Sequence, residues 1–188
     1  GEREKHTRPT GQELRCVPPT YRSATLGGPF GGGFGGVGSI NYGPLGAIGN
    51  VLGVRAMTIE AEPQVFELRG EEALRMHHLW GTNGLVLELE VALAPAHPWL
   101  ESLVVFDAFE PALRFADALA HAPGIVKREV AFFGSPVPDH LAQLAEHLPR
   151  GCHAVLSLVA ESCEAPVLEL VAAHGGRRRF RNAGAEGE

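Results

Sequence analysis

Glycine is the residue whose placement in this chain points most directly to ligand chemistry. Of the 24 glycines in 188 residues, 11 fall between Gly27 and Gly49. Glycine allows positive φ angles and lets a ligand or a neighbouring strand approach the backbone closely. Successive backbone N–H groups in glycine turns also form concavities that bind anions. The segment contains too many large apolar residues for a solvated linker: Phe30, Phe34, Val37, Ile40, Tyr42, Leu45 and Ile48. We therefore expect an ordered loop that packs on the rest of the protein.

Residues 31–38 match the Gly-x-Gly-x-x-Gly pattern of dinucleotide-binding Rossmann folds in two registers. That fingerprint also needs a strand before it and a helix after it. Here Gly27-Gly28-Pro29 precedes the pattern and a segment that reaches Gly43-Pro44 follows it, so no helix is expected to begin there. The spacing therefore argues against a Rossmann fold. The sequence has no Gly-Lys-Ser/Thr either, which excludes a P-loop.

Histidine and cysteine offer weaker signals. His77 and His78 are adjacent, and adjacent residues on a helix point about 100° apart, so the two rings cannot share one face. With no third ligand at a useful spacing, we predict no metal site and expect solvated or partly packed histidines. Cys16, Cys152 and Cys163 form no Cys-x-x-Cys motif, and a free cysteine is more often a small buried hydrophobe than a nucleophile.

Composition limits the class of protein. Hydrophobic residues make up 45% of the chain and the mean hydropathy is +0.01, which is enough for a real core. The net charge of −6 argues against a nucleic-acid partner, and the basic run at 177–181 is interpreted as a solvated face. No apolar run could span a membrane and no signal-peptide pattern opens the chain, so we expect a cytoplasmic protein.

The spacing of apolar residues predicts the strands and helices that would position these residues. We predict strands at 52–59, 64–68 and 85–93, and a short helix at 71–79. Pro95 and Pro98 lack the N–H donor that a sheet ladder needs, so a boundary between two substructures is predicted there. Residues 1–15 and 182–188 are predicted to be an irregular start and a tail.

After Trp99 the pattern alternates between strands and helices. The expected strands are 103–106, 125–133 and 154–159, and the expected helices are 110–121, 139–148 and a last one from about Pro166 to Gly175. In the helix at 110–121, the apolar face is predicted to hold Phe109, Leu113, Ala116 and Ala120. The second half is therefore predicted to be an α+β layer with helices packed on a small sheet.

Four features occur in the order seen in the FAD-linked oxidase family. They are a Pro-Pro approach to a Thr-Leu-Gly-Gly turn at 18–28, a Tyr-Gly pair at 42–43, a strand at 50–55 and a Gly-Thr-Asn-Gly turn at 81–84 that leads into a strand. Over about residues 17–95 the chain resembles this family, which has the vanillyl-alcohol-oxidase or PCMH type of flavin domain. Its members include glycolate oxidase, D-lactate dehydrogenase and alkyl-dihydroxyacetone-phosphate synthase.

The resemblance implies an α+β fold in two parts. Residues 16–97 would be the second half of a PCMH-type FAD-binding domain, and residues 98–181 would be the start of a ferredoxin-like α+β cap domain. The family's pyrophosphate loop lies upstream of Pro18 and its later active-site segment lies beyond residue 180. The resemblance therefore implies an internal piece of a longer protein, which by itself neither holds FAD tightly nor turns over substrate.

The same resemblance implies which residues would touch FAD. The expected contacts are Pro19, Thr20, Ala24, Thr25, Gly27, Gly28, Gly32, Gly33, Phe34, Gly35, Gly81, Thr82, Asn83, Gly84, Leu85 and Val86. We further expect that neither Gly28 nor Gly84 accepts a bulky side chain. The alternative is that these glycines only make tight turns and close strand packing.

The implied function is FAD-dependent oxidation of a small 2-hydroxy acid, such as glycolate or D-lactate, by hydride transfer to the flavin. No catalytic residue is identified from the sequence. The alternative is a non-catalytic subunit or scaffold that keeps the flavin-domain fold for assembly. The expected partners are a small-molecule substrate and either a second copy of the chain or another subunit.

Overall fold

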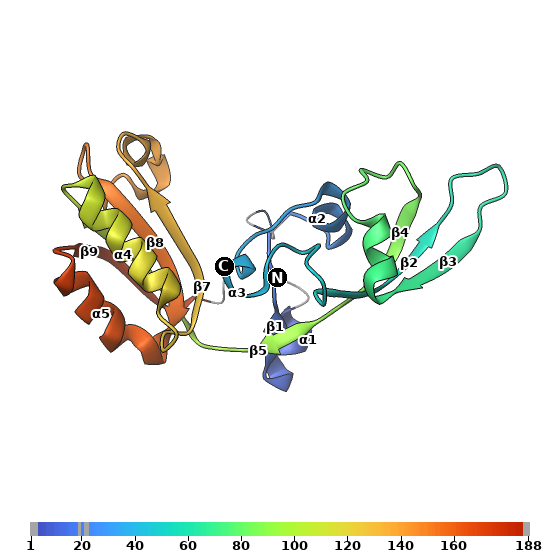
Figure 1. The fold of residues 1–188 in the computed structure, drawn as a ribbon, viewed down its shortest axis with the longest axis horizontal. Helices are drawn as coiled ribbons and strands as arrows, with labels where there is room; N and C mark the ends of the chain where they lie inside the picture. Colours follow the sequence, from blue (N-terminus) through green and yellow to red (C-terminus); the bar gives the residue numbers. More distant parts are fainter. Residues whose placement is uncertain (1–3, 19, 21–22, 186–188) are drawn as a thin grey trace. The chain divides into compact units, whose positions relative to one another are not determined.

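The computed structural model describes residues 4–18, 20 and 23–185 and divides the chain into two compact units, Gly1–Ala96 and His97–Glu188 (Figure 1). The division falls inside the Pro95–Pro98 segment, where two prolines interrupt any continuing ladder of backbone hydrogen bonds. Each unit has its own sheet and core, and each is described by itself below. No helix in the described part of the chain is long and apolar enough to cross a membrane.

The first unit begins with regular structure, so the prediction of an irregular start is wrong for residues 4–14. A short helix α1 (Glu4–Thr7) and a 3-10 turn η1 (Arg8–Thr10) lead into β1 (Gln12–Leu14), which pairs antiparallel with β5 (Leu93–Pro95). The partner strand lies some eighty residues along the chain, and a local sequence pattern carries no sign of such a distant pairing.

The main sheet of this unit has three antiparallel strands in the order β3-β2-β4: β2 (Val51–Met57), β3 (Val65–Arg69) and β4 (Leu85–Val91). These strands confirm the sequence prediction. On the outer face, the Arg55 guanidinium lies 2.5 Å from the Glu88 carboxylate, and Arg69 pairs with Glu90. The inner face packs into a cluster of buried apolar residues: Phe30, Leu45, Val51, Val54, Ala56, Ala73 and Met76.

Three short helical segments frame the glycine-rich region. The predicted helix at 71–79 is a 3-10 helix, η2 (Gly70–Met76), and it ends three residues early. The glycines themselves form α2 (Gly27–Gly32), and α3 (Ser39–Tyr42) begins just after them. The expectation that no helix could begin there is therefore wrong. Pro29 fits the first turn of α2 because backbone N–H groups in a first turn have no partner within the helix, so proline loses no helical hydrogen bond there.

The second unit has the order of a ferredoxin-like βαββαβ motif. Its four-stranded antiparallel sheet runs β7-β8-β6-β9, and α4 packs on that sheet and against α5 (Figure 1). The six elements are β6 (Trp99–Phe106), α4 (Phe109–His121), β7 (Lys127–Phe133), β8 (His153–Ala160), α5 (Glu164–Ala173) and β9 (Arg177–Ala185). A 3-10 turn, η5 (Glu161–Cys163), connects β8 to α5. The structure thus has all six elements of the motif.

Two expectations for this unit are wrong. The helix predicted at 139–148 is two 3-10 turns, η3 (Val137–His140) and η4 (Ala142–Leu144). Prolines on both sides of the segment limit its length. In addition, the Asp139 carboxylate accepts a hydrogen bond from the Gly151 N–H at 2.8 Å. The apolar face predicted for α4 is also rotated: Phe109 and Leu113 are exposed. The residues of α4 that are buried are Ala112, Phe115, Ala116 and Leu119.

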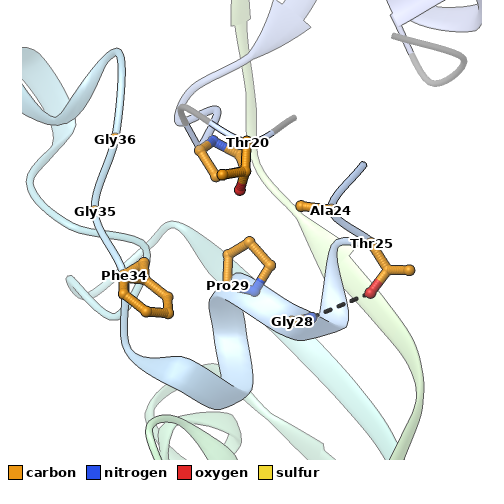
Figure 2. Close-up of a pocket in the computed structure, with 9 residues that line it drawn as sticks. Thr20, Ala24, Thr25, Gly28, Pro29, Phe34, Gly35 and Gly36 are labelled. Atoms are coloured by element: carbon orange, nitrogen blue, oxygen red, sulfur yellow. Dashed lines mark hydrogen bonds between the residues drawn. The ribbon is translucent and has the colours of Figure 1, made fainter. Parts of the chain in front are cut away.

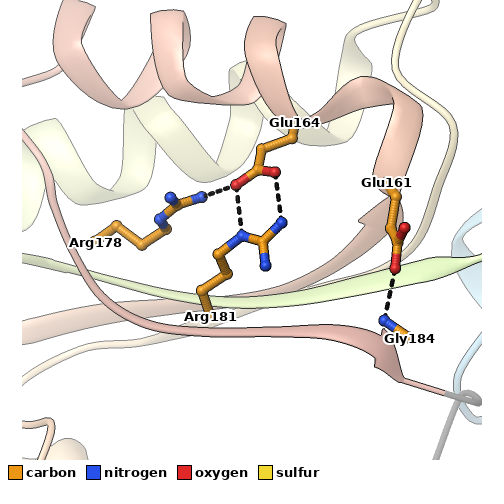
Figure 3. Close-up of polar contacts among 5 residues, drawn as sticks. All are labelled: Glu161, Glu164, Arg178, Arg181 and Gly184. Carbon is orange, nitrogen blue, oxygen red and sulfur yellow. Dashed lines mark hydrogen bonds and ion pairs between the residues drawn. The ribbon is translucent and has the colours of Figure 1, made fainter.

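The basic run at 177–181 and residues 182–185 of the predicted tail form the strand β9, in which Arg177, Arg179 and Arg181 are exposed as expected for a solvated face. Residues 186–188 lie outside the described residues. β9 lies at the edge of the sheet and pairs with β6, and its arginines meet carboxylates. Arg177 makes a two-pronged ion pair with Asp107, at 2.6 and 2.7 Å. Glu164 on α5 accepts hydrogen bonds from Arg178 at 2.6 Å and from Arg181 at 2.8 Å (Figure 3). The hydrogen bonds from Arg181 and Arg178 lower the pKa of Glu164 to about 2.

Candidate functional site

Two neighbouring cavities open in the first unit, and Thr25 lines both. The larger cavity has a volume of about 620 Å³, which is within the range of small-molecule sites (Figure 2). Its lining residues are Pro18, Thr20, Ala24, Thr25, Gly28, Pro29, Phe34, Gly35 and Gly36. The smaller cavity has a volume of about 260 Å³. Its lining residues are Thr25, Gly27, Gly31, Met76, Leu79, Gly81, Asn83, Gly84, Leu85 and Val86.

The walls of both cavities are mostly apolar. Proline rings, the Phe34 ring and bare backbone surround the larger one, and Thr20 and Thr25 supply hydroxyl groups. The Thr25 hydroxyl accepts a hydrogen bond from the Gly28 N–H at 3.3 Å (Figure 2). Among the described residues, no charged side chain lines either cavity. Such walls suit the uncharged ring portions of a ligand rather than its ionised groups.

Several glycines here are required by the fold alone. A Cβ at Gly36 would stand 2.2 Å from the Val17 carbonyl oxygen, because Val17 and Val37 form a β-bridge beside it. Gly84 has a φ of 138°, and its Cβ would lie 2.5 Å from the Met57 carbonyl oxygen. These contacts are with backbone, which cannot move aside. At these positions tight packing is sufficient to explain the glycine.

Gly27 and Gly31 have no such explanation. Both lie in α2, and a Cβ at either would meet nothing within 4 Å outside its immediate chain neighbours and its own helix backbone. Glycine in a helix interior costs about 1 kcal/mol relative to alanine, a cost that concerns Gly31 because Gly27 is the first residue of α2. The two residues are four positions apart, so they share one face of the helix, and both line the smaller cavity. A ligand that approached the bare backbone would account for them, because a side chain there would occupy its space.

The segment from His77 to Gly81 holds an unusual backbone conformation beside these glycines. His78 has a φ of 58° and Trp80 has a φ of 53°. Non-glycine residues with such angles cost of order 1–3 kcal/mol each and persist only where the surroundings impose them. Here the His78 N–H donates to the Phe30 carbonyl and the Trp80 N–H donates to the Gly31 carbonyl, both at 3.0 Å. The segment is therefore attached to the end of α2.

The rings of His77 and His78 pack against neighbouring rings. The His77 ring lies edge-on to buried Phe30, with 5.4 Å between ring centroids. Burial, and to a lesser extent the neighbouring His78, lowers the pKa of His77. No three His, Cys, Asp or Glu side chains among the residues that the structure describes are grouped to hold a metal ion. Cys16, Cys152 and Cys163 are buried, and burial raises the pKa of the Cys152 thiol.

The structure brings most of the predicted contact residues to the two cavities. Thr20, Ala24, Thr25, Gly28, Phe34 and Gly35 line the larger one, and Thr25, Gly27, Gly81, Asn83, Gly84, Leu85 and Val86 line the smaller one. Proximity to a cavity does not test whether FAD binds there, so these contacts stay predictions. Gly28 would place a Cβ 3.7 Å from the Thr25 hydroxyl, an ordinary contact, so sterics require glycine at Gly84 but not at Gly28.

Three predicted residues line neither cavity. A Cβ at Gly32 would lie 2.5 Å from the Phe34 ring and one at Gly33 would lie 2.3 Å from the His78 ring, so packing explains both glycines. The Thr82 hydroxyl donates to the Leu79 carbonyl at 2.8 Å and so belongs to the turn. Pro19 lies outside the described residues. Six lining residues were missed: Pro18, Pro29, Gly31, Gly36, Met76 and Leu79. Of these, Gly31 could have been found from its i+4 spacing to Gly27.

Comparison with known proteins places the fold. No sequence family matches the chain, and no curated protein matches it. Two solved structures of alkyldihydroxyacetonephosphate synthase, in different crystal forms, do match. The first match has a TM-score of 0.72 and a sequence identity of 16%, and it covers 98% of this chain. The second match has a TM-score of 0.70 and a sequence identity of 15%, and it covers 96% of this chain. The chain shares the α+β fold of that enzyme. It spans 40% and 38% of the two solved chains, so it corresponds to a part of them.

This finding confirms the predicted α+β fold class, and it gives no support to the predicted substrates. The matched enzyme is one of the FAD-linked oxidases that the sequence pattern resembles, and the fragment-like extent of the match agrees with that resemblance. Its name gives a substrate class different from glycolate and D-lactate, so those two substrates gain no support. At 16% identity the match shows the fold alone.

Proposed function

We propose that this chain supplies FAD-contacting surfaces of a flavin-dependent oxidoreductase. The observation that carries the proposal is the pair Gly27 and Gly31, which line a cavity where neither sterics nor backbone angle requires glycine. They occur in a chain whose fold matches an FAD-linked oxidase over 98% of its length. Bare backbone in a cavity wall is how proteins admit a large cofactor at close range.

The residues present fit the uncharged parts of FAD. When bound, the cofactor supplies the redox chemistry, and the protein supplies binding, orientation and protection from water. The apolar walls of the larger cavity, with the Thr20 and Thr25 hydroxyls as polar contacts, suit a ring system with a few hydrogen-bonding edges. No charged side chain among the described lining residues faces these cavities, so the pyrophosphate charge would need other groups.

The test fills the smaller cavity without harming the helix. Gly31→Leu places a side chain in open space and replaces glycine by a good helix former, so we expect equal or greater thermal stability and FAD binding at least about tenfold weaker. Gly124→Leu is the matched control, because a Cβ at Gly124 would also meet no heavy atom within 4 Å and this glycine lies in the second unit. Calorimetric titration with FAD and a melting curve measure the two effects.

Two results would contradict the proposal. The first is unchanged FAD affinity in Gly31→Leu, which would remove this cavity from the cofactor site. The second is a full-length wild-type protein that binds no FAD. The second result would favour the alternative of a non-catalytic subunit. The lack of charged groups among the described lining residues is the observation that supports this alternative. A purified protein that is colourless and carries a stable partner would agree with that alternative.

A further inference from the structure

Two exposed aromatic rings stand beside the cavities. Trp80 is 70% exposed and Phe34 is 54% exposed, and their ring centroids lie 6.3 Å apart in an edge-to-face arrangement. Phe34 lines the larger cavity, and the two chain neighbours of Trp80, Leu79 and Gly81, line the smaller one. Large aromatic rings rarely remain this exposed without a binding role when they gather beside a cavity.

Trp80 is held firmly although its ring is mostly in solvent. Its N–H donates to the Gly31 carbonyl at 3.0 Å, and its ring contacts the His78 ring at a centroid distance of 6.1 Å. His78 in turn contacts His77 at 6.0 Å, and His77 packs on Phe30, which is fully buried. A continuous row of rings therefore connects the exposed Trp80 to the core of the first unit.

The fold itself gives no reason for tryptophan at this position. With a φ of 53°, residue 80 adopts a conformation that glycine takes freely and a bulky side chain does not. Because the ring is 70% exposed, it buries little area in return. An unfavourable backbone angle and an exposed ring together indicate a residue retained for binding rather than for stability.

We infer that the exposed Trp80 ring, with Phe34 edge-on beside it, is an aromatic platform that stacks against a planar heteroaromatic ring of the bound cofactor. This inference rests on the proposed function and deepens it, because FAD contains two such rings, isoalloxazine and adenine. Aromatic side chains stack on planar bases with little dependence on which base is present. Isoalloxazine and adenine both offer a flat, uncharged π system to the platform. The experiment below distinguishes which of the two rings binds there.

The experiment uses probes that each carry one ring. FMN supplies isoalloxazine, AMP supplies adenine, and ribose 5-phosphate supplies the sugar phosphate without a ring. Trp99 is the other tryptophan of the chain and is buried in the second unit, so a Trp99→Phe background leaves Trp80 as the fluorescent reporter. We expect the ring that uses the platform to quench Trp80 emission in a saturable way, and we expect ribose 5-phosphate to leave it unchanged.

Variants at Trp80 separate binding from structure. Trp80→Leu keeps apolar bulk and should weaken binding of the quenching probe by about tenfold or more, as loss of one stacking contact does. Trp80→Phe should restore most of the affinity. Trp80→Gly relieves the backbone angle, so it should lose binding yet melt at the same temperature as wild type or higher, whereas a merely structural tryptophan would lower the melting temperature. Ile59→Ala, at a comparably exposed residue that lines neither cavity, is the control.

The outcomes distinguish this inference from the proposed function. Calorimetric FAD binding that is unchanged in Trp80→Leu would overturn the platform and leave the flavin site standing. Absence of both probe binding and FAD binding in the wild type would overturn both. Quenching by FMN alone assigns the platform to isoalloxazine, and quenching by AMP alone assigns it to adenine; either result supports the inference.

Discussion

The two units of the chain use their residues in different ways. The second unit follows ordinary rules of packing: β6 is almost wholly buried, α4 presents one apolar stripe to the sheet, and ion pairs hold the edge strand β9. The first unit has glycines in a short helix, two non-glycine residues at positive φ, and large rings in solvent. Both cavities described above lie in this first unit.

The difference teaches where to look for function. Local rules of helix propensity, backbone angle and burial fail together in the first unit at Gly27, Gly31 and Trp80, all within or beside one pair of cavities. Natural sequences tend to break such rules at functional sites and keep them elsewhere. The second unit breaks few of them, which is typical of a region that supports the fold.

The largest effect on stability should come from the core of the second unit. Phe115 is fully buried in α4 and packs against Phe106 with 5.4 Å between ring centroids. Phe115→Ala should therefore lower the free energy of unfolding of this unit by about 3–5 kcal/mol, since it leaves a cavity. If the units divide as we describe, flavin binding per folded molecule should not change. Chemical denaturation and FAD titration check this, and an equal loss of both would contradict the division.

A smaller loss is expected from a glycine that the fold of the first unit requires. Gly84→Ala would place a Cβ 2.5 Å from the Met57 carbonyl oxygen at a φ of 138°. Because backbone must shift, we expect a loss of about 3 kcal/mol in the free energy of unfolding. Gly28→Ala is the matched control, since its Cβ makes an ordinary contact and should cost less than about 1 kcal/mol. Equal melting temperatures for the two variants would show that Gly84 is not sterically constrained.

The sequence predicted those elements whose signal is local. An apolar run on both faces predicted β2, and the alternation of apolar residues with Glu88 and Glu90 predicted β4. β1 and β9 were missed because each depends on a partner far along the chain, and because β1 has three residues and β9 begins with a run of arginines. The segment 139–148 has helical spacing of its leucines but is stopped by prolines and by the Asp139 hydrogen bond. The spacing of apolar residues alone does not reveal that prolines and a side-chain hydrogen bond prevent a helix.

The candidate site was predicted residue by residue from the family resemblance, but the reason for each glycine was not. Glycine clustering pointed to the right segment, but the sequence does not tell whether a glycine is bare for a ligand, as at Gly31, or for a carbonyl, as at Gly36. That distinction depends on what lies across the gap from each Cα. The exposure of the Trp80 ring was not predicted, because it depends on the positive φ angles of residues 78 and 80, which neither residue type suggests.

The smallest effect is expected at the edge of the second unit. Arg181 and Arg178 lower the pKa of Glu164 to about 2, below its value of 4.5 in an unfolded chain. A carboxyl group whose folded pKa is lowered stabilises the fold above its unfolded pKa, and this contribution is lost as the pH falls from 4.5 toward about 2. Because solvent screens these groups, Glu164→Gln should cost no more than about 1 kcal/mol near neutral pH. The stability gap between variant and wild type should close as the pH approaches about 2. Unfolding curves recorded across this pH range decide the matter, and a gap that widens in acid would show that the arginine contacts do not stabilise β9.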